Sequence, residues 1–79
     1  MKTYNGHKNW NHWNVSLWIN NDENLYRLAK GLVDCYEKCG GRDEAAKALL
    51  ESLVNGGTTK TPDGAPYSVS SIRAAMVGM

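Results

Sequence analysis

The sequence predicts an all-α fold: a small single-domain bundle of about four helices behind an irregular N-terminal arm. Apolar residues recur at helical spacing in four separate segments. Asparagine, serine and paired glycines stand between these segments, where helices begin and end. No alternating apolar and polar run is long enough to predict a strand. A chain of 79 residues has room for one domain, and we place that domain at 1–79.

The charge of the chain argues against two kinds of partner. A net charge of +1 gives no long-range field that would attract nucleic acid or an anionic membrane. No apolar run approaches the roughly 20 residues that span a bilayer, and the first ten residues do not resemble a secretion signal. We therefore expect a cytoplasmic protein that does not bind nucleic acid directly and has no contact with a membrane.

The first helix is predicted from three tryptophans and one leucine. Trp10, Trp13 and Leu17 fall at i, i+3 and i+7, with Trp18 beside them, and Asn9 is a suitable N-cap. Tryptophans at helical spacing in a chain without phenylalanine usually supply the bulk of a core. We expect Trp13, Leu17 and Trp18 to lie in the interior.

Asn14 stands out within this helix. It lies on the face shared by Trp10 and Trp18, where a buried amide requires hydrogen-bond partners. Val15 and Ile19 project to the opposite side, which makes the helix apolar nearly all round and central to the fold. We expect a buried, hydrogen-bonded Asn14 to fix how this helix docks.

A second helix is expected to begin at 20–23, where Asn20 and Glu23 resemble a capping box and Asp22 suits the helix dipole. It should end at the glycine pair 40–41. Its predicted inward residues are Leu25, Leu28, Ala29, Leu32, Cys35, Tyr36 and Cys39.

The third helix should be capped near Asp43, end at 55–57, and pack against the second as an antiparallel or steeply crossed pair. The stretch 61–64, Thr-Pro-Asp-Gly, has the chemistry of a type I turn. Ser68 or Ser70 can cap a last short helix. The predicted inward residues of the two helices are Ala46, Leu49, Leu50, Leu53 and Val54, then Val69, Ile72, Met76 and Met79.

Neither a metal site nor an active site is predicted. Cys35 and Cys39 lack zinc-finger spacing and have places on the core stripe, so we expect free, partly buried thiols; His7 and His12 are expected at the surface. No nucleophile with a base, no paired carboxylates in an apolar setting and no phosphate loop is found. We expect a protein that is not an enzyme and needs no cofactor.

A DNA-reading helix-turn-helix is a weaker alternative. The second and third helices have a short connection, but the third offers only Arg42 and Lys47 against three acids, Asp43, Glu44 and Glu51. A recognition helix needs several exposed polar and basic groups to reach bases and phosphates. The charge pattern does not favour this class.

The first third of the chain contains a specific motif, roughly W-N-V-x-L-W-I-x-N-D-E-x-L-Y, carried by 4–6, 9, 13–15, 17–23 and 25–26. With this motif and the turn at 61–64, the chain resembles a family of small uncharacterised phage and prophage proteins. His12 and the cysteine pair depart from the pattern. The rest of the chain matches only in its helical character.

This resemblance implies an origin in phage and a function carried out in the host bacterial cell. It suggests an anti-CRISPR inhibitor of a type I system, for example type I-C. Such an inhibitor binds the crRNA-guided surveillance complex (Cascade) and blocks target DNA recognition. The alternative is a small phage regulator or adaptor that binds DNA or a phage protein.

Two physical routes to inhibition fit the sequence. Acids could mimic phosphate, although near-neutral charge disfavours broad DNA mimicry; the five candidates are Asp22, Glu23, Asp43, Glu44 and Glu51. Exposed aromatic anchors such as Tyr4, Trp10 or Tyr67 could instead fill a groove of the target protein, which is the route we favour. A homodimer that buries more apolar surface is a further alternative. The predicted partner-binding residues are Tyr4, His7, Lys8, Trp10, Asp22, Glu23 and Tyr67.

Overall fold

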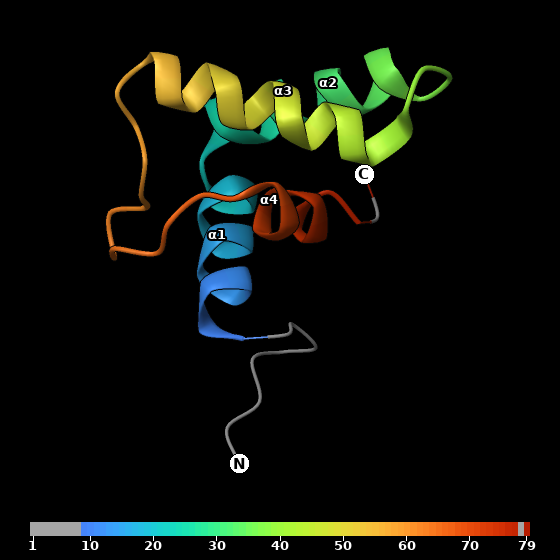
Figure 1. Cartoon of the computed structure of the whole chain (residues 1–79). Coiled ribbons are helices and arrows are strands. Elements are labelled where there is room, and N and C mark those ends of the chain that lie inside the picture. Colours follow the sequence, from blue (N-terminus) through green and yellow to red (C-terminus); the bar gives the residue numbers. More distant parts are fainter. Residues whose placement is uncertain (1–8, 78) are drawn as a thin grey trace.

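Four helices make up the regular structure of residues 9–77 and 79, which are the residues that the computed structural model describes. They are α1 (Trp10–Asn21), α2 (Glu23–Tyr36), α3 (Gly41–Asn55) and α4 (Val69–Ala75). Helices α2 and α3 lie side by side and antiparallel in one layer, and α1 and α4 lie against each other beneath it (Figure 1). Within the described residues the β structure is limited to one isolated bridge, between Lys60 and Pro66. The predicted all-α bundle is confirmed.

A single residue separates the first two helices. Asn9 caps α1 as predicted, because its side chain accepts a hydrogen bond from the backbone N–H of His12 at 3.0 Å. Asp22 closes α1 and caps α2, with its carboxylate accepting from the backbone N–H of Leu25 at 3.1 Å. The capping box predicted from Asn20 is therefore wrong. Asn20 still belongs to α1, where its amide donates to the carbonyl of Ser16.

The boundary between α2 and α3 also differs from the prediction. Helix α2 ends at Tyr36 rather than at the glycine pair, and 37–40 form the turn. Gly40 has a φ of 99°, and a Cβ there would collide with the side chain of Glu44. Helix α3 begins at Gly41, so Asp43 lies in its first turn and is not its cap. The predicted end at 55–57 and the Ser68 cap of α4, which forms a reciprocal pair with Ser71, are confirmed.

The core is built from aliphatic side chains. Its largest fully buried apolar members are Val15, Ile19, Leu49, Ile72 and Met76, and one cluster joins all four helices with the loop before α4. The remaining buried members are mostly alanines: Ala29, Val33, Ala45, Ala46, Leu53, Ala65, Tyr67 and Ala75.

The tryptophan stripe does not face this core. Val15 and Ile19 form the buried side of α1, whereas Trp13 and Trp18 are half-buried and Leu17 is 37% exposed. The predicted interior position of Leu17 is therefore wrong, and that of the two tryptophans holds only in part. Helix α1 packs against α4, α2 and the loop before α4, and these neighbours leave Trp10 and Leu17 exposed, so a helix that is apolar all round keeps part of its apolar surface outside.

Four further predicted inward residues lie outside the core. Leu28 and Val54 are exposed, and Cys35 is exposed together with Cys39. Ala29 and Val33 define the buried side of α2, and Cys35 follows Val33 by two positions, about 200° around a helix. Both thiols are free, as predicted, but their predicted burial is wrong.

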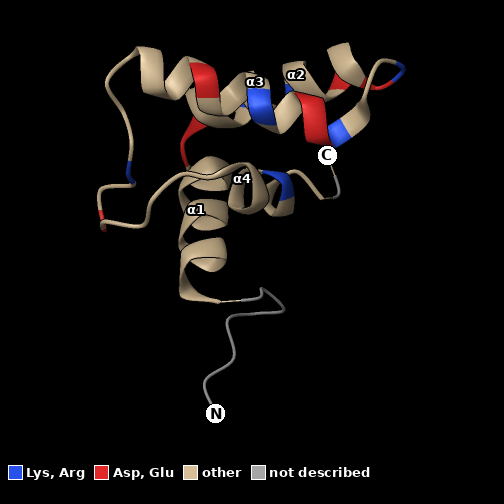
Figure 2. Cartoon of the chain, in the orientation of Figure 1, with Lys and Arg blue, Asp and Glu red and all other residues tan. Residues whose placement is uncertain are grey.

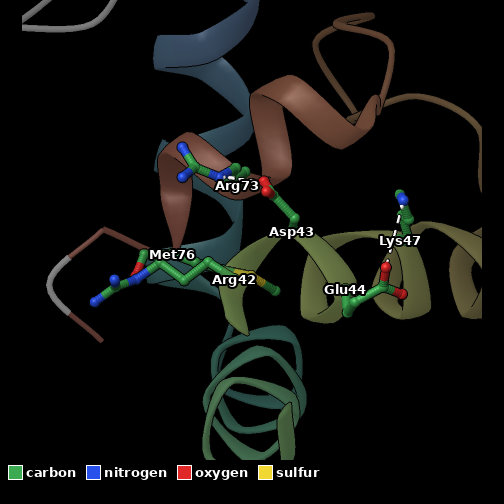
Figure 3. Close-up of polar contacts among 6 residues, drawn as sticks. All are labelled: Arg42, Asp43, Glu44, Lys47, Arg73 and Met76. Atoms are coloured by element: carbon green, nitrogen blue, oxygen red, sulfur yellow. Dashed lines mark hydrogen bonds and ion pairs between the residues drawn. The ribbon is translucent and has the colours of Figure 1, made fainter. Parts of the chain in front are cut away.

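Polar contacts tie α4 to the start of α3. Figure 3 shows the Arg73 side chain paired with the Asp43 carboxylate, and the Arg42 side chain donating from Nε to the carbonyl oxygen of Met76 at 3.1 Å. Lys47 approaches Glu44 at 3.5 Å on the same helix. These contacts hold α4, which has only 7 residues, in a fixed orientation on α3.

None of the helices within residues 9–77 combines the length and the apolar composition that crossing a bilayer requires.

Replacing Ile19 with alanine should lower the free energy of unfolding by about 2 to 5 kcal/mol, because the change leaves a cavity in a fully buried site. Leu17→Ala is the matched control on the same helix and should change it by less than about 1 kcal/mol, since Leu17 is exposed. Urea unfolding followed by circular dichroism measures both. Equal effects of the two substitutions would contradict the assigned face of α1.

Candidate functional site

A cluster of hydrogen bonds fastens the loop before α4 to α1. We call it the Asn14 cluster; it consists of Asn14 and Trp18 from α1 and Thr61 and Asp63 from the loop. The Asn14 amide and the Trp18 indole N–H both donate to one carboxylate oxygen of Asp63 at 2.9 Å. The Thr61 hydroxyl donates to the Asn14 amide oxygen at 2.6 Å. Asn14 is 1% exposed, so the prediction of a buried, hydrogen-bonded Asn14 is confirmed.

The loop has its own internal support. The backbone N–H of Gly64 donates to the carbonyl of Thr61 at 2.9 Å, which closes the predicted turn at 61–64. The Thr61 hydroxyl also accepts from the backbone N–H of Ala65 at 3.0 Å, and the Thr61 N–H donates to the Ala65 carbonyl at 2.8 Å. Gly64 has a φ of 95°, a conformation that glycine adopts without strain. The turn therefore presents Asp63 to α1 in a fixed position.

The Asp63 carboxylate is held in its charged form. The hydrogen bonds from Asn14, and secondarily from Trp18, lower the pKa of Asp63 below its ordinary value, because both donors favour the ionised oxygen. The carboxylate also remains in contact with solvent. The Asn14 cluster thus includes one permanent negative charge at neutral pH.

A groove opens beside this cluster, between the α1–α2 junction and the loop. Its cavity volume is about 460 Å³, within the range of ligand pockets. The apolar part of its lining comes from α1, α2, α3 and the loop, and the polar part from the α2 cap and the loop. The lining residues are Trp18, Leu25, Leu53, Pro62 and Tyr67, with Asp22, Asn24, Thr58, Lys60 and Thr61.

Tyr67 is the most buried aromatic side chain in the groove. It is 8% exposed and belongs to the core cluster, so the prediction of an exposed anchor is wrong. The backbone N–H of Tyr67 donates to the carbonyl of Thr59 at 3.0 Å, which pulls this part of the loop inward. Burial, and to a smaller extent the charge of Asp22, raises the pKa of Tyr67, so the hydroxyl stays protonated.

The other predicted binding residues are distributed over two surfaces. Trp10 is exposed at the start of α1, and Asp22 lines the groove. Glu23 is exposed and pairs with Arg27 at 2.5 Å. Tyr4, His7 and Lys8 lie outside the described residues.

Sequence reasoning missed most of the groove. Leu25 and Leu53 are predicted as inward residues, which the structure confirms, but nothing in the sequence predicts that they line a groove together with Thr58, Lys60 and Pro62. The turn chemistry of 61–64 was the available signal, because a turn with a carboxylate must place that group against some partner. The path of the loop in the folded protein decides that the carboxylate of Asp63 meets α1.

Within 9–77 and 79, no three histidine, cysteine, aspartate or glutamate side chains lie together in a way that could hold a metal ion. His12 contacts Ser70, with 3.0 Å between its Nε2 and the hydroxyl oxygen.

The fold and the groove define a small all-α protein of four helices with a ligand-sized depression beside its first helix junction. The chain belongs to DUF7249, a family of unknown function, whose model matches residues 1–79. No curated protein and no solved structure matches the chain.

Asn14→Ala should lower the free energy of unfolding by about 2 to 3 kcal/mol, because it removes hydrogen bonds to a charged group and leaves the Thr61 hydroxyl without one of its partners. The matched control is Asn21→Ala, an exposed asparagine at the end of the same helix, with an expected change within about 0.5 kcal/mol. Urea titration measures both. If Asn14→Ala is as stable as the parent, the cluster does not fix the loop.

The lowered pKa of Asp63 predicts an acid-dependent loss of stability. The contribution of this carboxylate is fully present above its unfolded value of 3.8, and it is lost as the pH falls from there through the lower folded value. Asp63→Asn removes the titration and should reduce the loss of stability between pH 7 and about pH 3 relative to the parent. Identical pH profiles for the two proteins would show that Asp63 is not held as the structure indicates.

Proposed function

We propose that this protein is a non-enzymatic inhibitor that acts by binding a protein complex in the cytoplasm of a host bacterial cell. The specific target we propose is a type I CRISPR surveillance complex, for example that of type I-C. The protein would block the recognition of target DNA by this complex. The resemblance of its first third to small phage and prophage proteins motivates the choice of target. The observation that carries the protein-binding part is an exposed apolar face on α1.

That face consists of Trp10 and Leu17. They are seven positions apart, so they lie on the same side of α1, and each is 37% exposed. Asn21 continues the same side toward the junction with α2, and it is exposed. A large aromatic side chain ringed by polar groups is the usual anchor of a protein interface, and leucine adds apolar area beside it. We call Trp10 and Leu17 the α1 face.

The charges support a protein partner over a nucleic acid. The basic side chains of α3, the helix that would read DNA in a helix-turn-helix, are already engaged: Arg42 donates to Met76, and Lys47 approaches Glu44. Arg73 of α4 pairs with Asp43. Figure 2 shows basic and acidic positions interspersed over α2, α3 and α4 rather than gathered on one face. Direct DNA binding depends on a cluster of lysine and arginine that can reach phosphates.

The same pairing argues against mimicry of DNA by acids. Three of the five acids that could serve as phosphate mimics have cationic neighbours: Glu23 pairs with Arg27, Asp43 with Arg73, and Glu44 with Lys47. A mimic needs unpaired negative charge on one surface. Apolar anchoring by the α1 face is therefore the favoured route.

Size-exclusion chromatography with a purified type I-C surveillance complex tests the proposal. We expect co-elution and loss of target-DNA binding by the complex. Separate elution with intact DNA binding would remove this target. A salt-sensitive gel shift of duplex DNA by the protein alone would instead support the alternative, a small regulator that binds DNA.

Trp10→Ala should weaken binding to the complex by about tenfold or more without unfolding the protein, because a partly exposed anchor adds more to an interface than to the core. The matched control is Val54→Ala, an exposed apolar residue on α3 outside the α1 face. Its affinity should equal that of the parent. If both variants bind alike, the α1 face is not the contact surface.

A further inference from the structure

The walls of the groove are suited to a flat or elongated group. Two aromatic side chains, Trp18 and Tyr67, line it from α1 and from the loop, and Leu25, Leu53 and Pro62 complete the apolar surface. Aromatic faces attract cations as well as apolar groups, and a guanidinium stacks on them more readily than an ammonium does. The walls alone thus allow an apolar or a cationic occupant.

The Tyr67 hydroxyl is a polar group without a hydrogen-bond partner among the described residues. Tyr67 is more than nine-tenths buried, yet its hydroxyl makes no hydrogen bond with any other residue that the structure describes. No buried side-chain oxygen or nitrogen among these residues is left unsatisfied, so the hydroxyl must reach solvent, and Tyr67 meets solvent in the groove. A protonated hydroxyl there can accept a hydrogen bond from a ligand or donate one.

Asp22 supplies a carboxylate oxygen at the same place. One oxygen, Oδ1, accepts from the backbone N–H of Leu25 and is fixed by this capping bond. The other oxygen has no hydrogen-bond partner among the described residues. Asp22 is also close enough to Tyr67 for its charge to act on the hydroxyl. An anchored carboxylate and a hydroxyl that line the same groove can both accept hydrogen bonds from a group with several N–H donors.

The charge around the groove has a negative excess. Asp22 lines it, and Asp63 borders it through its bond to the Trp18 indole, which is part of the wall. Lys60 is the cation of the lining, and its exposed side chain forms no ion pair with a described residue, so it is free to turn toward solvent. Acidic positions accordingly appear at the α1–α2 connection and in the loop before α4 (Figure 2). Two carboxylates against one ammonium favour a cationic occupant.

We infer that the groove receives an arginine side chain of the partner protein. The aliphatic stem packs between Trp18 and Tyr67, and the guanidinium meets the Asp22 carboxylate and the Tyr67 hydroxyl. This inference rests on the proposed function, because it names the chemistry of the protein that is bound. The α1 face supplies apolar anchors, and the groove at the other end of the same helix adds a charged one.

Nuclear magnetic resonance titration of the full chain alone tests this inference. The probe is the tripeptide acetyl-leucyl-arginyl-leucine amide, and two further tripeptides carry norleucine or glutamate in the middle position. The Trp18 indole N–H, assigned by its loss in Trp18→Phe, reports on the groove because it belongs to the wall and to the Asn14 cluster. We expect a saturable shift of this resonance with the arginine peptide and a much weaker response to the other two.

The decisive variant is Asp22→Asn. Asparagine caps a helix about as well as aspartate, so α2 should remain intact while the charge is lost. The affinity for the arginine peptide should fall by about tenfold, because a charge-assisted hydrogen bond is replaced by a neutral one. Tyr67→Phe keeps the ring and should cause a smaller loss. The matched control is Asp34→Asn, the same change at an exposed position of α2 outside the groove, which should leave affinity unchanged.

Three results would overturn the inference. They are the absence of a saturable shift with the arginine peptide, equal binding of the norleucine or glutamate peptide, and an equal loss of affinity in Asp22→Asn and Asp34→Asn. The titration contains no surveillance complex, so its failure leaves co-elution with that complex as a separate result. Conversely, arginine binding without co-elution would keep the groove and remove the proposed target.

Discussion

The hydrogen bonds of Asn14 are the constraint on which the rest of the structure depends. The loop that joins α3 to α4 must cross from one layer of helices to the other, and it contains little regular structure of its own. Its attachment to α1 through Asp63 and Thr61 fixes where Tyr67 enters the core and where α4 begins. A buried amide with both its oxygen and its nitrogen engaged accepts few alternative positions of the loop. One polar residue on α1 thus sets the position of a quarter of the chain.

This polar attachment also explains the unusual placement of the tryptophans. Trp18 turns toward the loop because its indole N–H finds the Asp63 carboxylate there, and the ring becomes a wall of the groove. Trp10 lies at the start of α1 and remains exposed. The core is then left to Val15 and Ile19 with aliphatic partners from the other helices. The aromatic residues of α1 consequently lie at the boundary of the protein, where they can serve both packing and recognition.

The two candidate contact surfaces are joined by α1. The α1 face contains Trp10 and Leu17, and the groove begins at Trp18 and Asp22, where the helix ends. A partner that lies along α1 could place an apolar surface on the first and a basic side chain in the second. Such a combination gives specificity. The apolar contact accepts many kinds of apolar surface, whereas a carboxylate and a hydroxyl together select a side chain whose N–H donors can reach both. It also places the proposed interaction on a rigid helix rather than on the loop alone.

The sequence by itself determined the number of helices, the Asn9 and Ser68 caps, the turn at 61–64 and the burial of Asn14, because these depend on contacts among residues close in the chain or on the cost of burying an amide. It did not determine which side of each helix faces inward. Leu17, Leu28, Cys35 and Val54 fit helical periodicity, but an apolar stripe on a small domain can exceed the surface that its neighbours cover. Only the tertiary structure decided the groove, since its lining comes from three helices and a loop, and no local pattern encodes how such distant segments meet.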